Sequence, residues 1–236
     1  MKIFEKCERL DNVARAKEWG LYPYFHVLNT KQDTRVEMEG RDILMIGSNN
    51  YLGLTSDERV IRAGVEALEK YGSGCSGSRF LNGTLETHVA LEKELAAFLR
   101  KEDAVSFSTG FQSNLGIISA VAGRTDTVLC DKENHASIYD GCRLSFAKMV
   151  RYNHSDMEDL ERKLASLDLS AGGALIVTDG VFSMSGEICR LPEIVRIAKK
   201  YGAGVMVDDA HGLGVLGEGG RGTACLLYTS DAADDL

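Results

Sequence analysis

The sequence predicts an α/β protein with a mostly parallel sheet covered by helices. Two observations support this fold class. From residue 104 onward, short apolar runs of strand length alternate with segments of helical periodicity. The chain has 236 residues, of which 44% are hydrophobic, so it has ample apolar surface to offset the entropy lost on folding. Strands that alternate with helices in this way are typical of a sheet with both faces covered.

The segment before residue 104 contains elements of mixed type. We predict a polar helix and then a loop at 20–23 within residues 1–35, followed by strand-like alternation over 35–45. Ser56 is expected to cap a helix that ends near Gly72. The apolar face of this helix is formed by Val60, Ile61, Gly64, Val65 and Leu68. A second helix over 86–100 is expected to turn its apolar residues inward, namely Leu91, Leu95, Phe98 and Leu99.

The segment from 104 to 208 is expected to form the sheet and most of its covering helices. The predicted strands cover 104–108, 127–131, 174–178 and 205–208. The predicted helices cover 112–121, 157–167 and 192–201. Ser155 is expected to cap the middle one of these helices, and Pro192 fits the first turn of the last.

The charge of the chain and its cysteines exclude several classes of protein. Asp and Glu number 35 against 27 Lys and Arg, and no basic run is present, which argues against nucleic acid as a partner. No apolar run approaches the ~18 residues of a membrane-spanning helix, and the polar N-terminus is unlike a signal peptide. The 6 cysteines have the spacing of neither a zinc site nor a disulfide framework. We therefore expect a cytoplasmic protein with reduced cysteines.

One glycine-rich motif is a misleading match. Residues 72–77, with the sequence GSGCSG, fit the G-x-G-x-x-G pattern of dinucleotide sites. Such a site requires the motif between a strand and a helix, whereas here it follows a predicted helix. A loop that passes close to a ligand or a neighbouring subunit fits these residues better.

Two of the predicted strand ends carry residues that suit a phosphorylated aromatic ligand. After the first, Gly110 and Phe111 lead into a helix whose free N–H groups suit a phosphate, although an ordinary strand-to-helix turn would look the same. After the second, the imidazole of His135 can stack on an aromatic ring, or it can simply cap a helix.

The third strand end places Asp208, Asp209 and His211 together. Burial of Asp208 would be costly without a cationic partner, and a protonated ring nitrogen is such a partner. His211 can donate to an oxygen on the same ring. A metal site is the competing interpretation, but no third ligand has suitable spacing, so we predict no metal. A phosphate cradle, a stacking imidazole and a carboxylate for a ring nitrogen together describe pyridoxal phosphate (PLP), whose ring acts as an electron sink.

These residues resemble those of the α-oxoamine synthases, a family of PLP-dependent acyltransferases. The resemblance runs from about residue 20 to residue 223 and implies the large domain of PLP fold type I, incomplete at its C-terminus. It rests on the motifs NNYLGL at 49–54, GSRFLNGT at 77–84, STGFQSNLG at 108–116, NHAS at 134–137, VFSM at 181–184 and VDDAHG at 207–212.

The resemblance implies a role for each matching residue. His135 would stack on the pyridine ring, Asp208 would pair with its nitrogen, and His211 would bond its phenolic oxygen, so these residues are the catalytic candidates. The residues implied in binding the cofactor are these same ones together with Gly110, Phe111 and Ser183. Asn49 and Ser78 would lie near the amino-acid substrate, with Ser78 supplied by the partner subunit of a homodimer.

Within the family, the motifs are similar to the serine palmitoyltransferase branch. This branch condenses L-serine with palmitoyl-CoA, with loss of carbon dioxide, to give 3-ketosphinganine in sphingolipid biosynthesis. Glycine C-acetyltransferase and 8-amino-7-oxononanoate synthase are the alternatives within the family. A non-catalytic partner subunit, or a fragment that does not fold stably, is the alternative outside it.

The sequence departs from the family at its C-terminal end. The family's Schiff-base lysine lies about thirty residues after the D-x-A-H motif, which places it beyond Leu236, and we expect the chain to be inactive alone. We expect an N-terminal helix and strand segment at 1–45, a partial PLP-binding domain at 46–224 and a non-family tail at 225–236. This pattern predicts a truncated enzyme.

Overall fold

The computed structural model describes residues 4–5, 7–8 and 11–227. The chain divides into two compact units, Met1–Gly74 and Cys75–Leu236. The domain boundaries expected after residues 45 and 224 stay predictions, and most of the expected tail lies outside the described residues.

The first unit contains two helices and a hairpin: α1 (Asp11–Glu18), β1 (Arg35–Met38), β2 (Arg41–Leu44) and α2 (Glu58–Tyr71). The strand-like alternation over 35–45 is thus two antiparallel strands. They are joined by Glu39 and Gly40, which both have positive φ angles, as a tight hairpin turn requires. Gly72 ends α2 as expected.

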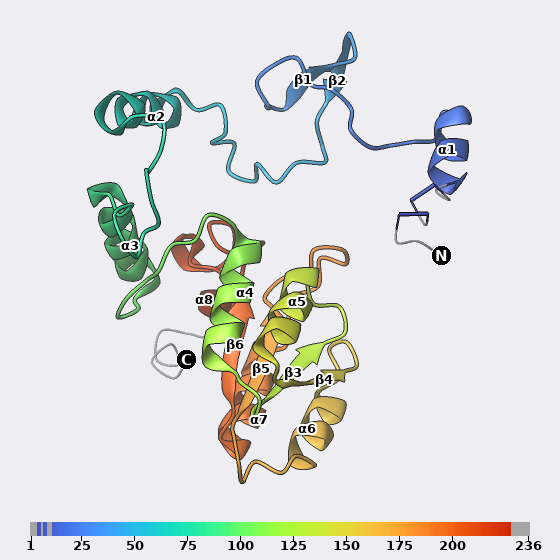
Figure 1. The fold of residues 1–236 in the computed structure, drawn as a ribbon, viewed down its shortest axis with the longest axis vertical. Helices are drawn as coiled ribbons and strands as arrows, with labels where there is room; N and C mark the ends of the chain where they lie inside the picture. The colour runs from blue at the N-terminus through green and yellow to red at the C-terminus, as the bar shows by residue number, and fades with distance from the viewer. Residues whose placement is uncertain (1–3, 6, 9–10, 228–236) are drawn as a thin grey trace. The chain divides into compact units, whose positions relative to one another are not determined.

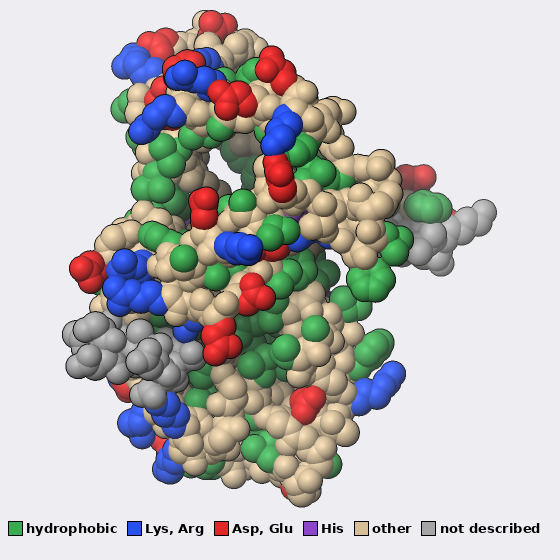
Figure 2. Space-filling model, turned by 90° about the vertical axis from the view of Figure 1, so that its left-hand side faces the viewer, with side chains coloured by type: hydrophobic (Ala, Val, Ile, Leu, Met, Phe, Trp, Pro, Cys, Tyr) green, Lys and Arg blue, Asp and Glu red, His purple; other side chains and the backbone are tan. Residues whose placement is uncertain are grey.

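The predicted N-cap of α2 is wrong. Its N-cap is Asp57, whose carboxylate accepts the Arg59 N–H at 2.8 Å, whereas the Ser56 hydroxyl donates to Asp33 instead. No described residue of α2 is buried, so its expected apolar face is not packed into a core. Figure 2 shows hydrophobic side chains exposed between charged ones on the face that it views.

The second unit forms a four-stranded, fully parallel sheet with the order β4-β3-β5-β6 (Figure 1). Its strands are β3 (Thr127–Asp131), β4 (Lys148–Tyr152), β5 (Ala174–Asp179) and β6 (Gly204–Asp208). Its helices are α3 (Glu86–Leu99), α4 (Gly110–Val121), α5 (Ala136–Ser145), α6 (Met157–Ala165), α7 (Leu191–Tyr201) and α8 (Thr223–Leu227), with a short 3₁₀ turn at Glu218–Gly220. The predicted fold class is confirmed.

The core of this unit has one cluster on each face of the sheet. On one face, Val128, Cys130 and Val177 pack with residues of α4 and α5. On the other, Leu129 and Ile176 pack with residues of α6 and α7. Adjacent residues of one strand point to opposite faces, so both faces need apolar cover. Each fully buried side chain of this kind contributes about 1.5–3 kcal/mol.

The structure corrects several elements predicted in this unit. Residues 104–108 form no strand, because they pair with no neighbouring strand in the described part and the Ser106 N–H donates to Glu92 instead. Asp156, not Ser155, caps α6 by accepting the Asp159 N–H. The elements α5, β4 and α8 were not predicted from the sequence. On α3, Leu91 and Phe98 are exposed rather than turned inward.

The register of the sheet aligns three aspartates at one edge. Asp179 lies opposite Asp208 across β5 and β6, and Asp131 ends β3 in the ladder next to them. The carboxyl ends of these strands therefore form a polar edge, where parallel α/β sheets bind ligands. None of the described helices has both the length and the apolar character needed to cross a bilayer.

Candidate active site

Asp208 is held at the end of β6 by neutral donors. The side-chain amide of Asn114 donates to Asp208 Oδ2 at 2.7 Å, and the Ala210 N–H donates to Oδ1 at 3.2 Å. Asn114 is buried in α4 and also donates to the Ser137 hydroxyl at 2.8 Å. These bonds fix the carboxylate, but they add no positive charge that would neutralise it.

Close packing of α4 against α5 makes this arrangement possible. A Cβ atom added to Gly141 of α5 would lie 2.9 Å from the Asn114 carbonyl oxygen. Glycine at 141 therefore lets α5 bring Ser137 close to Asn114. The sequence analysis overlooked Asn114. The sequence signal for Asn114 was a polar residue one turn before Ile118. Ile118 is fully buried and so marks the inner face of the helix.

His135 is the N-cap of α5. Its ring Nδ1 accepts the Ser137 N–H at 3.3 Å and lies 2.7 Å from the Ser137 hydroxyl, while its own backbone N–H donates to Asp179 Oδ2 at 2.8 Å. The helix-cap alternative is therefore correct as a description of its local geometry. His135 is an exposed residue, and its stacking role stays a prediction.

Asp179 is a buried carboxyl group that the sequence analysis missed. It ends β5 and is 6% exposed. Burial raises the pKa of Asp179 to about 6 and the charge of Asp208 adds to this effect, although the bond from the His135 N–H opposes it. The signal in the sequence was an aspartate that ends an apolar strand, as in the other two strands.

The first turn of α4 lies beside this carboxyl edge. Thr109 caps the helix, with its hydroxyl accepting the Gln112 N–H at 3.1 Å. Gly110 and Phe111 are the first residues of the helix, where N–H groups have no partner within the helix. A Cβ added to Gly110 would meet no atom within 4 Å, so the position that a side chain at 110 would take is open.

Asp209 points in a different direction from its neighbour Asp208. It accepts the Thr223 hydroxyl at 2.5 Å and the Thr223 N–H at 2.7 Å. A Cβ added to Gly180, Gly212 or Gly222 would lie less than 3.0 Å from an oxygen of this carboxylate. Asp209 thus fastens the loop after β6, which carries the half-buried His211.

The remaining predicted residues lie on loops. Ser183 is exposed in the loop 181–188, directly after β5. Ser78 is exposed in the loop 77–84, where its carbonyl accepts the N–H groups of Leu81 and Gly83. Asn49 lies in the first unit and accepts the Tyr51 hydroxyl at 3.2 Å. Their roles toward cofactor and substrate stay predictions.

The loop that carries Ser78 is anchored through Arg79. The guanidinium of Arg79 pairs with Glu92 of α3 and donates to the Ser106 hydroxyl at 2.8 Å. Together with the Ser106 N–H, Arg79 lowers the pKa of Glu92 to about 2. This carboxylate joins the loop 77–84, α3 and the segment 104–108.

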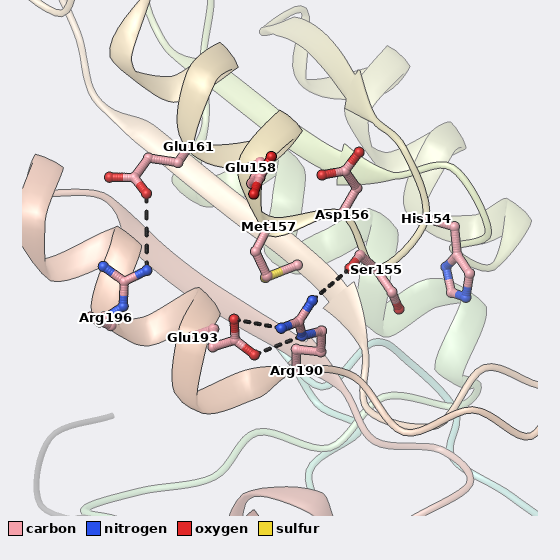
Figure 3. A pocket seen from close by; sticks show the side chains of 9 residues that line it. All are labelled: His154, Ser155, Asp156, Met157, Glu158, Glu161, Arg190, Glu193 and Arg196. Carbon is pink, nitrogen blue, oxygen red and sulfur yellow. Dashed lines mark hydrogen bonds and ion pairs between the residues drawn. The ribbon is translucent and has the colours of Figure 1, made fainter.

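A separate pocket of about 470 Å³ opens between α6 and α7 (Figure 3). Its walls carry the paired charges of Arg190 with Glu193 and Arg196 with Glu161. His154 lines one end of this pocket. None of the predicted site residues lines it, so it is distinct from the cluster around Asp208.

The fold and the carboxyl-edge cluster define an α/β protein with a candidate ligand site at the carboxyl ends of a parallel sheet. A family model for aminotransferase class I and II matches residues 41–232. The chain therefore belongs to this family.

Two relatives and one solved structure show which members of known families this chain is similar to. A serine palmitoyltransferase from Sphingobacterium spiritivorum is 54% identical over 233 residues, covering 99% of this chain and 58% of the relative. An 8-amino-7-oxononanoate synthase from Geobacter sulfurreducens is 52% identical over 208 residues, covering 88% and 53%. A solved structure of SPT (serine palmitoyltransferase) with PLP has a TM-score of 0.93 at 40% identity, covering 99% of this chain and 59% of its own. The resemblance to the α-oxoamine synthases is confirmed, and the chain spans little more than half the length of these relatives.

Proposed function

We propose that the chain is the cofactor-binding part of a PLP-dependent acyltransferase. The observation that carries this proposal is the cluster at the carboxyl edge of the sheet. There the donors to the Asp208 carboxylate among the described residues are neutral, and one of them, Asn114 of α4, connects it through Ser137 to His135.

The chemistry of these donors fits PLP. Asp208 would pair with the ring nitrogen, and His211 would bond the phenolic oxygen with Ser183 nearby. The N–H groups of Gly110 and Phe111 would bind the phosphate at the start of a twelve-residue helix. His135 would cover one face of the ring. When bound, PLP supplies an electron sink for the substrate carbanion.

The residues of this chain would act mainly by holding charge in place. Asn114 and the Ala210 N–H fix both oxygens of Asp208, so this carboxylate is pre-oriented toward a protonated nitrogen. Ser137 fixes the imidazole of His135 through Nδ1, so the ring plane is set before any ligand arrives. Such preorganisation reduces the cost of reorientation during the reaction.

For the complete protein we propose decarboxylative condensation of L-serine with palmitoyl-CoA to give 3-ketosphinganine. The relative named serine palmitoyltransferase supports this choice. The synthesis of 8-amino-7-oxononanoate is the second candidate, because the relative with that name is almost equally identical. Asn49 and Ser78 would contact the amino acid, with Ser78 coming from the partner subunit of a cytoplasmic homodimer.

We also propose that this 236-residue chain is inactive alone. Lys199 and Lys200 lie at the end of α7, which precedes β6, and so belong to the edge of the sheet opposite Asp208. Lys200 is also paired with Glu161 at 2.6 Å. Neither lysine can therefore take the part of the family's Schiff-base lysine.

Equilibrium dialysis of the chain against PLP tests the proposed binding, and borohydride reduction followed by mass spectrometry tests the proposed inactivity. We expect saturable, reversible binding that inorganic phosphate weakens, and no PLP-derived mass increase on a lysine. Absence of binding would refute the cofactor site, whereas a reduced adduct on a lysine would refute inactivity.

The proposed substrates are tested by an assay of CoA release with the complete protein that the gene encodes. Release of CoA from palmitoyl-CoA with serine should exceed its release from acetyl-CoA with glycine. Release with the second pair alone would overturn the choice of serine and palmitoyl-CoA.

A further inference from the structure

His154 lies between two carboxylates at the carboxyl edge of the sheet. It follows β4, with ring Nδ1 2.8 Å from Asp131 Oδ1 and ring Nε2 2.5 Å from Glu187 Oε2. The imidazole also contacts the edge of the Phe182 ring, with the two centroids 4.4 Å apart. A neutral imidazole has one N–H donor, so both hydrogen bonds can form together only when the ring is an imidazolium.

Asp131 explains why a cation is needed at this position. Its carboxylate is 2% exposed and accepts the N–H groups of Glu133 and Ser155, each at 2.9 Å. These bonds orient the carboxylate but leave its charge in place. A carboxylate buried this deeply requires a nearby positive charge, and His154 is its ion-pair partner among the described residues.

Glu187 connects the same imidazole to the loop that carries Ser183. The Phe182 N–H donates to the Glu187 carbonyl at 2.9 Å, and the Gly186 N–H donates to the Phe182 carbonyl at 2.8 Å. These backbone bonds close the loop 181–188 on itself. The side chain of Glu187 then fastens the closed loop to His154, and through His154 to Asp131 at the end of β3.

We propose that His154 is a positioning residue whose imidazolium clamps the loop 181–188, and with it Ser183, to the carboxyl edge of the sheet. The meaning of the clamp for the cofactor depends on the function proposed above, since it assumes that Ser183 contacts PLP. The clamp itself depends only on the contacts among Asp131, His154 and Glu187.

The clamp depends on pH in a defined direction. Burial lowers the pKa of His154, but the hydrogen bonds to Asp131 and Glu187 outweigh this effect and raise it above its ordinary value. The stabilisation is therefore complete below the pKa of an unfolded histidine and is lost as pH rises through the folded pKa. Other charged groups line the same pocket (Figure 3). Asp156 and Glu158 lie at the start of α6, and Arg190, just before α7, is already paired with Glu193.

Hydrogen–deuterium exchange of the unliganded chain tests the clamp without any cofactor. After correction for intrinsic rates, the amides of loop 181–188 should exchange faster at pH 8.5 than at pH 5.5, because the imidazolium that holds the loop is lost as pH rises. Glu187→Gln should remove this pH dependence while the melting temperature stays nearly unchanged, because Glu187 is 59% exposed. His154→Gln should also remove this pH dependence, but it should lower the melting temperature, because the buried Asp131 loses its cationic partner. His26→Gln, which alters an exposed histidine–glutamate pair in the first unit, is the matched control.

The outcomes separate the clamp from the proposed function. Loop exchange that is the same in the native chain and in Glu187→Gln at both pH values would overturn the clamp. Faster loop exchange in Glu187→Gln with unchanged PLP affinity would overturn the link to Ser183 and leave the clamp in place. Failure of the native chain to bind PLP at all would refute the proposed function instead, since the exchange experiment contains no PLP.

Discussion

Two aspartates at the same edge of one sheet are held in opposite ways. Asp208 receives its hydrogen bonds from an amide and a backbone N–H, neither of which carries a charge. Asp131 receives backbone N–H bonds and, in addition, an ion pair with His154. Asp131 is thus neutralised within the chain, whereas Asp208 is oriented and left to attract a cation from outside. This difference separates a structural carboxylate from a candidate ligand site, although both end a parallel strand.

The largest effect should come from removal of the structural carboxylate. Asp131→Ala leaves His154 and two N–H groups without their acceptor, so we expect a loss of about 3–5 kcal/mol in the free energy of unfolding. Urea unfolding of the chain at pH 6.5 measures this loss. The matched control is Asp168→Ala in an exposed loop, which should change the free energy of unfolding by no more than about 0.5 kcal/mol. A loss below 1 kcal/mol in Asp131→Ala would remove the basis for calling Asp131 structural.

Asp208, the carboxylate of the candidate ligand site, should show the reverse behaviour. Asp208→Asn removes the charge but keeps the shape of the side chain, so PLP affinity should fall by about 10- to 100-fold, or 1.4–2.8 kcal/mol. The free energy of unfolding should change little, because no internal cation loses its partner. Dialysis against PLP and urea unfolding measure the two quantities on one preparation. A stable protein with native PLP affinity would mean that Asp208 does not pair with the cofactor.

Features of the site that depend on residues close together in the sequence were predicted, whereas features that depend on residues far apart in the sequence were not. The alternation of strands and helices predicted the sheet, and the positions of His135 and Asp208 after apolar runs predicted the carboxyl edge. Asn114, Asp179 and the bridge of Asp131 with His154 were missed. Each of these is defined by a partner 23 to 94 residues away along the chain. The strand predicted at 104–108 is wrong for a related reason. A strand requires a neighbouring strand to pair with, and the sequence pattern of one segment does not identify that neighbour.

A variant of Asn114 can separate the effect of the orientation of Asp208 on PLP affinity from the effect of its charge. Asn114→Ala should leave Asp208 and Ser137 without their shared donor, which costs about 1–3 kcal/mol of unfolding free energy. PLP affinity should fall less than in Asp208→Asn, because the carboxylate charge remains. Urea unfolding and dialysis again give both values, with Ser113→Ala on the same helix as the control. If PLP affinity fell as far as in Asp208→Asn, orientation rather than charge would dominate the site.

The last effect concerns Asp179, and its sign is the opposite of the usual one for a carboxyl group. Because its pKa is raised to about 6, the folded chain binds a proton more tightly than the unfolded chain between pH 4 and pH 6. Stability from this group is therefore present at low pH and lost as pH rises through about 6. Asp179→Asn cannot ionise, and its side-chain oxygen can still accept the His135 N–H. We expect the variant to match the native chain near pH 4 and to be more stable by up to about 3 kcal/mol at pH 7.5, as measured by urea unfolding across this range. A variant less stable than the native chain at pH 7.5 would show that the negative charge of Asp179 is itself required beside His135, and Asp179 would then belong with Asp208 rather than with the structural carboxylates.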